Sequence, residues 1–201
     1  MEQSLLQADH AEIVRHIESW QQGKVCLHQS DTLPGLSFSP THLQGILRLT
    51  ALKGRDPNKP CLSLVSRIDM AVQWWEPLST QALAKIEEIW PSATSIICKA
   101  NSEAPPSLVS AQGEIGFRFP AHWPDPQLKQ IIDQLGQPYP STSVNKSGEP
   151  AITDFNQAKA FITTQADTYV PANVNIQGTP ATQPSKIIRL SPDGTIEVLR
   201  P

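Results

Sequence analysis

Segments whose apolar residues follow a helical spacing alternate with short apolar runs along most of this chain. Residues 11–22 carry Ile13, Ile17 and Trp20 at helical spacing and are followed by a glycine, a typical helix stop. The short apolar run 24–28 comes next and is typical of a strand. Such an alternation, sustained over the whole length, predicts an α/β fold whose sheet is mostly covered by helices.

The same patterns predict the other elements. A helix is predicted to open at Ser39-Pro40 and to end near Gly54. Its residues predicted to face the core are Leu43, Ile46, Leu47 and Leu52. Further helices are predicted from 66–69 onward and at 80–89, 126–135 and 155–162, and strands at 61–65, 94–99, 114–119, 139–143, 186–190 and 195–199. The last two strands are predicted to form a hairpin, and 29–37 and 171–184 to be loops.

The composition limits what such a fold can do. Hydrophobic residues make up 39% of the 201 residues, enough for a core, and charged residues only 17%, which excludes a disordered polyelectrolyte. The net charge of −3 argues against a general nucleic-acid coat protein, which needs a broad basic face, but leaves room for a small basic pocket. At this length we expect a single domain over residues 1–201.

The cysteines and histidines indicate neither a disulfide framework nor a metal site. Cys26, Cys61 and Cys98 lie in apolar surroundings without a C-x-x-C pair, which is typical of buried, reduced thiols. The five histidines show no H-x-x-x-H or H-E-x-x-H spacing, so no protein-held metal is expected. We see neither a signal-peptide pattern nor an apolar run approaching the roughly twenty residues of a membrane span. We therefore expect a cytoplasmic protein without a membrane segment.

Three cations precede the predicted strand 61–65. Lys53, Arg55 and Lys59 lie in the sequence KGRDPNK. Arginine offers a planar fork of donors that matches phosphate or carboxylate oxygens, and lysine adds a point charge, so these residues are candidates for an anion site. The alternative is a solvated helix C-terminus, where positive charge stabilises the helix dipole. The residues alone leave both interpretations open.

Other polar segments also stand at predicted strand ends, where ligands of open α/β sheets bind. They are SDTLPG at 30–35, STSVNKSG at 141–148 and Ser185 in QPSKII. The alternative is ordinary turn or cap chemistry, to which Asn, Ser and Gly are suited. Arg118, between two phenylalanines of an alternating strand, faces either solvent or a cleft. The phosphate-loop, dinucleotide-binding and G-x-S-x-G motifs are absent.

Taken in order, these segments resemble the YrdC/Sua5 family, the threonylcarbamoyl-AMP synthases. QSDTLPGL stands where the family has PT-[DE]-T-V-Y-G-L, KGRDPNKPCLSLV where it has KGRP…KP and a strand, and WPSATS where it has WPGPLT. RFPAHWP, STSVNKSGEP and PSKII match RVP.HP, STSAN.SG.P and PS-[ETK]-I. The six motifs agree in order and spacing over roughly residues 25–200, and the length resembles the short bacterial form. The resemblance implies a twisted, mixed open sheet flanked by helices, with a central cleft.

The resemblance also implies roles for individual residues. The implied ATP-binding residues are Lys53, Arg55, Lys59, Thr94, Ser143 and Asn145. The implied residues for L-threonine or the adenylate are Thr32, Arg118, Ser143 and Ser185. Lys53 and Arg55 would act on the phosphates as the catalytic cations, and Arg118 would clamp the threonine carboxylate.

The implied reaction joins L-threonine, bicarbonate or CO2, and ATP into threonylcarbamoyl-AMP and pyrophosphate. The enzyme is then a nucleotidyltransferase, with Mg²⁺ held mainly by ATP. In the family the product passes to a downstream tRNA threonylcarbamoyltransferase complex, which modifies the adenosine next to the anticodon.

The chain departs from the family pattern at Gln29, Ser30, Pro34 and Val144. Pro34 removes an aromatic wall and a hydroxyl from the implied amino-acid side, and Val144 adds bulk between two implied ATP-binding residues. These departures leave the amino acid open. Two alternative functions remain beside the first: a double-stranded RNA or tRNA-binding module without ATP turnover, and a paralogue that adenylates another carbamoylated substrate.

Overall fold

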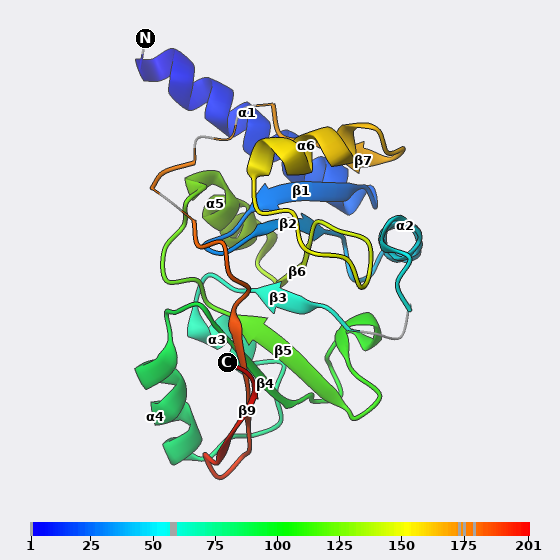
Figure 1. Cartoon of the computed structure of the whole chain (residues 1–201). Coiled ribbons are helices and arrows are strands. Elements are labelled where there is room, and N and C mark those ends of the chain that lie inside the picture. Colours follow the sequence, from blue (N-terminus) through cyan, green and yellow to red (C-terminus); the bar gives the residue numbers. More distant parts are fainter. Residues whose placement is uncertain (1, 57–59, 173, 175, 179) are drawn as a thin grey trace.

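The computed structural model describes residues 2–56, 60–172, 174, 176–178 and 180–201, and the side chains from residue 10 onward. Within these residues nine strands form one twisted sheet in the order β7-β1-β2-β6-β3-β5-β4-β8-β9. Parallel and antiparallel neighbours are mixed, and helices flank the sheet (Figure 1). The predicted mixed α/β fold is confirmed.

The elements follow one another in an irregular alternation. The helices are α1 (Glu2–Gln21), α2 (Leu43–Lys53), α3 (Ile68–Val72), α4 (Thr80–Ile89), α5 (Pro126–Leu135) and α6 (Phe155–Thr163), with a short 3-10 helix at Pro106–Leu108. The strands are β1 (Val25–Gln29), β2 (Pro34–Ser37), β3 (Leu62–Leu64), β4 (Thr94–Lys99), β5 (Glu114–Arg118), β6 (Tyr139–Ser143), β7 (Thr168–Tyr169), β8 (Lys186–Leu190) and β9 (Ile196–Arg200). The elements with the predicted bounds are α4, α5, β4, β6 and β8.

Local start and stop signals explain why α4 and α5 were predictable. Ser79 caps α4 and accepts a hydrogen bond from the Ala82 N–H at 3.1 Å. Asp125 caps α5, Pro126 occupies its first turn, and Gly136 ends it in the left-handed conformation at φ 64°. These signals act within a few residues, so the sequence pattern is sufficient to place both helices.

The centre of the sheet brings together three segments that are distant in sequence. β2 pairs antiparallel with β6, where Gly35 lies opposite Ser143. β3 pairs antiparallel with β6 on the other side, where Leu62 lies opposite Ser141, and parallel with β5, where Leu64 lies opposite Arg118. The polar strand ends singled out in the sequence therefore meet at one place.

The core consists of large apolar side chains that are almost wholly buried, among them Trp20, Leu27, Phe117, Ile132 and Tyr139. α1 packs against both β1 and α5, and α6 also contacts β1 (Figure 1). Because α1 presents Ile13 and Trp20 to this core, the predicted inner face of the first helix is confirmed.

Two predictions at the start of the chain were wrong. The first helix begins at Glu2 rather than at residue 11. The predicted loop 29–37 contains β2, which begins at Pro34. Proline at the first position of a strand costs no ladder hydrogen bond, and the neighbouring strands β1 and β6 supply the pairing, so tertiary contacts override the turn-like sequence.

The predicted start and inward-facing residues of α2 were also partly wrong. The helix begins at Leu43, with His42 rather than Ser39 at its N-cap. Leu43 is 65% exposed and Leu47 is 47% exposed, although both were predicted to face inward. The buried residues of α2 lie four apart on another face, at Gly45, Leu49 and Lys53.

The predicted long loop is confirmed for the described residues between 171 and 184, which contain neither helix nor strand. None of the helices in the described part of the chain combines the length and the apolar character needed to cross a bilayer.

Candidate active site

A cleft with a volume of about 720 Å³ opens across the centre of the sheet. This volume lies within the range of roughly 300–1,000 Å³ typical of small-molecule sites. The predicted site residues that line it are Thr32, Lys53, Arg55, Arg118, Ser143, Asn145 and Ser185. Lys59, also predicted, lies outside the described residues.

Lys53 joins the end of α2 to the loop after β6. Its Nζ donates to the Ser143 carbonyl and, at 3.0 and 3.1 Å, to the carbonyl and Oδ1 of Asn145. Ser143 Oγ donates to the same Oδ1 at 2.6 Å, and the Ser147 N–H donates to the Lys53 carbonyl at 2.7 Å. Two segments about ninety positions apart are therefore held as one unit. An ammonium has three N–H donors, and Lys53 has three protein acceptors for them. Lys53 therefore offers a ligand chiefly its positive charge.

Arg55 is held at the cleft wall by neutral groups of β6 and of the segment just before β3. Its Nη1 lies 3.3 Å from Cys61 Sγ and 3.5 Å from Thr142 Oγ1, and its Nη2 donates to the Pro60 carbonyl. Burial raises the pKa of the Cys61 thiol, so this sulfur stays protonated beside the guanidinium. The result is a cation with a defined direction at the cleft.

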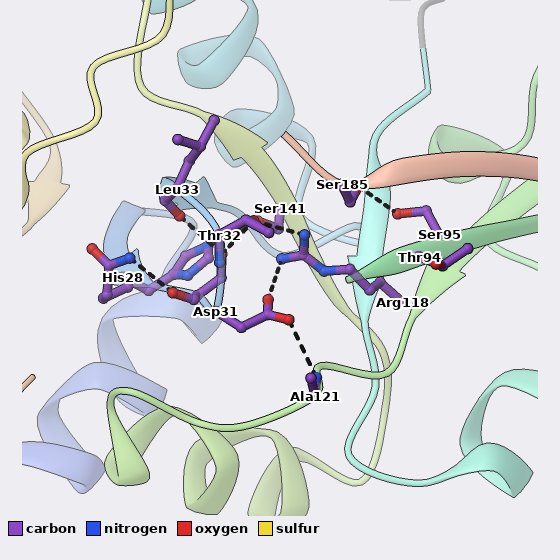
Figure 2. A network of polar contacts seen from close by, with 12 residues as sticks. His28, Asp31, Thr32, Leu33, Thr94, Ser95, Arg118, Ala121, Ser141 and Ser185 are labelled. Atoms are coloured by element: carbon purple, nitrogen blue, oxygen red, sulfur yellow. Dashed lines mark hydrogen bonds and ion pairs between the residues drawn. The ribbon is translucent and has the colours of Figure 1, made fainter. Parts of the chain in front are cut away.

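Arg118 faces the cleft rather than solvent. Its Nη2 lies 3.0 Å from Asp31 Oδ1, and its Nη1 donates to Thr32 Oγ1 at 2.7 Å (Figure 2). Asp31 Oδ2 also accepts from the Ala121 N–H at 3.2 Å. Burial lowers the pKa of Arg118, and the Asp31 charge opposes that shift. Each Nη carries two N–H groups and makes one of these contacts, so Arg118 keeps a second N–H on each Nη for a carboxylate.

Next to Arg118, whose strand partner on β4 is Ser95, Ser185 belongs to a group that the sequence did not reveal. Its Oγ lies 2.9 Å from Ser95 Oγ, and its carbonyl accepts from Arg200 Nε and Nη2 at 2.9 and 2.6 Å. Ser95 and Arg200 also line the cleft, whereas Thr94, predicted beside the nucleotide, does not. Side chains alternate along β4, so Ser95 takes the place at the cleft and Thr94 points elsewhere.

The contact between His28 and Ser141 at the centre of the sheet was not predicted, although Ser141 belongs to the candidate segment 141–148. Ser141 lines the cleft, and its Oγ lies 3.1 Å from Nε2 of the fully buried His28. A histidine within a predicted strand gives no functional signal in the sequence, because a buried histidine is an ordinary core residue. Asp31 was equally inconspicuous as a single carboxylate in a loop.

Positive charge predominates in the cleft although the whole chain is acidic. Among the described residues that line it, the cations are Lys53, Arg55, Arg118 and Arg200, and the carboxylates are Glu114 and Glu149. Glu114 is also engaged by Arg189, with Oε1 3.0 Å from Nε. Over the described residues, no group of three or more His, Cys, Asp or Glu side chains is gathered that could hold a metal ion. The donor set therefore suits an anion.

Comparison with protein families agrees with this geometry. A model of the Sua5/YciO/YrdC proteins, with the description "Telomere recombination", matches residues 18–201. The chain belongs to this family. The Sua5/YciO/YrdC match takes in every cleft residue named above.

Curated members of the family have a common name. A "Threonylcarbamoyl-AMP synthase" of Pseudoalteromonas translucida is 28% identical over 184 residues, which cover 90% of this chain and 94% of that protein. One of Thiobacillus denitrificans is 31% identical over 134 residues, covering 66% of this chain and 70% of that protein.

Solved structures share the fold. E. coli YciO matches with a TM-score of 0.77 at 20% identity, covering 94% of this chain and 87% of that chain. P. abyssi Sua5, solved in complex with L-threonine, matches with a TM-score of 0.78 at 17% identity. The match covers 96% of this chain but only 54% of Sua5.

Proposed function

We propose that this protein is an L-threonylcarbamoyladenylate synthase, a nucleotidyltransferase that forms threonylcarbamoyl-AMP and pyrophosphate from L-threonine, bicarbonate and ATP. The observation that carries the proposal is the cleft in which Lys53 contacts Ser143 and Asn145 and Arg55 contacts Thr142. The name shared by the curated relatives supports the same reaction.

The cleft suits two substrates that differ in charge distribution. Lys53 and Arg55 lie at one part of its wall and would attract the triphosphate. Thr32 and Arg118 contact each other at another part and would orient the amino acid, with Ser185 close to the forming adenylate. Oriented cations and hydroxyls are what a reaction between two anions requires.

The chemistry proceeds in two steps. The neutral amine of threonine attacks CO2 and releases a proton, or attacks bicarbonate and releases water; either route gives a carbamate. A carbamate oxygen then attacks the α-phosphorus of ATP, and the bond to the bridging oxygen breaks as pyrophosphate leaves. Lys53 and Arg55 would stabilise the charge that builds on the phosphates. No side chain is needed as a dedicated base, so positioning and electrostatics carry the catalysis.

Mg²⁺ would enter with the nucleotide. The described residues that line the cleft include two carboxylates and four cations, so the protein would bind the phosphates by charge and would offer few ligands of its own to a hard cation. The ion would be coordinated mainly by triphosphate oxygens and would offset part of their charge.

We further propose that the product serves tRNA modification at the adenosine next to the anticodon. A downstream threonylcarbamoyltransferase complex would take the adenylate, because a mixed carbamic–phosphoric anhydride is too reactive to accumulate. A function in tRNA modification implies an activity in the cytoplasm. Contact with tRNA would be made either through the downstream complex or by this protein directly.

Mass spectrometry of the products tests the proposal. The protein is incubated with ATP, Mg²⁺, bicarbonate and L-threonine, and we expect threonylcarbamoyl-AMP together with threonine-dependent release of pyrophosphate. Omission of bicarbonate is the matched control and should abolish both signals.

Other outcomes would contradict the proposal in distinct ways. Adenylation of another amine, but not of threonine, in a panel of amino acids would indicate a paralogue with a different substrate. Salt-sensitive RNA binding without any nucleotide turnover would indicate an RNA-binding module instead.

A further inference from the structure

His28 lies directly beneath the cleft, although it does not line it. Its side chain is fully buried, and its Nε2 lies 3.1 Å from Oγ of Ser141, which does line the cleft. The ring also packs edge-on against Tyr139, with the ring centroids 5.3 Å apart. A buried polar ring is thus connected to the site through a single hydroxyl.

The sheet leaves space for this pair at Gly35. His28 of β1 lies directly opposite Gly35 of β2. A Cβ at Gly35 would lie 2.5 Å from His28 Cε1 and Nε2, and 2.9 Å from Ser141 Oγ. Only glycine therefore permits the His28–Ser141 contact at this point of the sheet.

The partners of the ring decide which nitrogen carries its proton. Burial, with smaller contributions from His16 and Arg118, lowers the pKa of His28 to about 3, so the ring is neutral near pH 7. Nδ1 is buried without a hydrogen-bond partner among the described residues. A proton on Nδ1 would leave a buried N–H unpaired, whereas a proton on Nε2 is donated to Ser141 Oγ and leaves only a lone pair unmatched. The second arrangement costs less.

We propose that His28 is a positioning residue: its Nε2–H donates to Ser141 Oγ and so directs the Ser141 hydroxyl hydrogen into the cleft. There the hydroxyl donates to an anionic oxygen of the bound amino acid. The proposal rests on the proposed function for the identity of that ligand, but the direction of the His28–Ser141 hydrogen bond does not depend on it.

The location of Ser141 selects the amino acid rather than the triphosphate as its ligand. Figure 2 shows Ser141 between His28 and the contact of Thr32 with Arg118. An anionic oxygen placed there would meet the Ser141 hydroxyl and the second N–H of Arg118 Nη1, whose first N–H contacts Thr32. Both groups donate, so they match a carboxylate.

Steady-state kinetics of three variants test the proposal. His28→Phe keeps the aromatic shape against Tyr139 but removes the N–H, and it should raise KM for L-threonine about 3- to 10-fold, with kcat and KM for ATP changed less than twofold. Ser141→Ala should raise the same KM by at least as much. Since both act through one hydroxyl, the double variant should differ from Ser141→Ala by less than about twofold.

Two further variants separate positioning from packing. His28→Gln places an amide N–H near the position of Nε2 and should restore KM for L-threonine to within about twofold of the unmodified protein. His16→Phe is the matched control, because His16 is also buried and hydrogen-bonds Tyr139 OH at 2.6 Å but does not line the cleft. It should lower stability without changing KM for threonine.

Several results would overturn the proposal. One is an unchanged threonine KM in His28→Phe while Ser141→Ala raises it. Another is full additivity in the double variant, and a third is an equal rise of both substrates' KM values.

A spectroscopic measurement distinguishes this proposal from the proposed function. Long-range ¹H–¹⁵N NMR correlations of the ring should place the His28 proton on Nε2 in the unliganded protein. A proton on Nδ1 would overturn the positioning role even if the enzyme is active. A proton on Nε2 in a protein that makes no threonylcarbamoyl-AMP would refute only the proposed ligand and function.

Discussion

Arg118 and Asp31 form an ion pair whose side chains are 8% and 1% exposed, at the wall of the cleft. Such a pair is costly to bury, and its value lies in geometry: it holds Thr32, Arg118 and the Ala121 loop in one arrangement. Lys53 also holds neighbouring groups in place, because its ammonium donates hydrogen bonds to Ser143 and Asn145. At the scale of single residues, the charged groups of the site are also the groups that hold it together.

Replacing Arg118 with methionine tests this dual role. Arg118→Met leaves the Asp31 carboxylate buried without its cation, so the free energy of unfolding should fall by about 3–5 kcal/mol in urea titrations. Arg67→Met removes an exposed pair with Asp69 and should change it by less than about 1 kcal/mol. Equal effects of the two variants would contradict a buried, uncompensated charge at Asp31.

Replacing Arg55 with alanine tests the phosphate side. Loss of a charged hydrogen bond to phosphate costs about 1.5–3 kcal/mol, so Arg55→Ala should weaken ATP binding roughly 10- to 150-fold by calorimetry. Arg48→Ala, on the preceding helix α2, is the control, because Arg48 contacts Gly23 and Asp167 and is not among the described residues that line the cleft. An unchanged ATP affinity in Arg55→Ala would remove this residue from the site.

Among the elements, α2 and the loop after it deliver both cations to the cleft. The helix ends at Gly54, whose φ of 57° lies in the left-handed region and whose N–H donates to Ala51. This stop turns the chain between Lys53, which is still helical, and Arg55, whose guanidinium contacts Thr142 of β6. A helix continued by one turn would carry Arg55 away from the cleft.

Substitution of Gly54 tests the importance of this turn. Among the described residues no atom lies within 4 Å of a Cβ at this position, so we expect the effect of Gly54→Ala to come from backbone conformation. We expect a loss of about 1–2 kcal/mol in the free energy of unfolding and a weaker affinity for ATP. Gly54→Asn should lose less, because asparagine tolerates the left-handed region. A larger loss for Asn than for Ala, measured by denaturation, would contradict this account.

The elements also show where sequence patterns fail. α4 and α5 have start and stop residues within one turn of their ends, and both were predicted with their correct bounds. β2 has proline and glycine in a short polar context and forms only because β1 and β6 lie on its two sides. The outward direction of Leu43 and Leu47 likewise depends on where the rest of the molecule meets α2.

At the scale of the whole molecule, two buried histidines make the free energy of unfolding depend on pH. Burial lowers the pKa of His16 to about 4 and of His28 to about 3, from an ordinary value of 6.5. In the unfolded chain both rings take up protons as the pH falls below 6.5, while the folded protein keeps them neutral down to these lower values. The unfolded state therefore gains protons first, and stability falls as the solution is acidified.

Denaturation at several pH values measures this coupling. Between pH 6.5 and pH 5 each histidine should lower the free energy of unfolding by up to about 1.4 kcal/mol per pH unit, with little contribution above pH 7. His16→Phe and His28→Phe should each remove the contribution of one histidine to the pH dependence of the free energy of unfolding. A slope that both variants leave unchanged would show that other groups cause the acid sensitivity.

The sequence by itself determined the α/β class, the bounds of α4, α5, β4, β6 and β8, and the presence of polar groups at strand ends. Those features depend on patterns repeated within one element, so neighbouring residues are enough to specify them. Only the tertiary structure decided that Arg118 is held by Asp31 and Thr32, that Ser95 rather than Thr94 lines the cleft, and that His28 supports Ser141. These contacts join side chains 86 to 113 positions apart, where no local periodicity links one residue to the other.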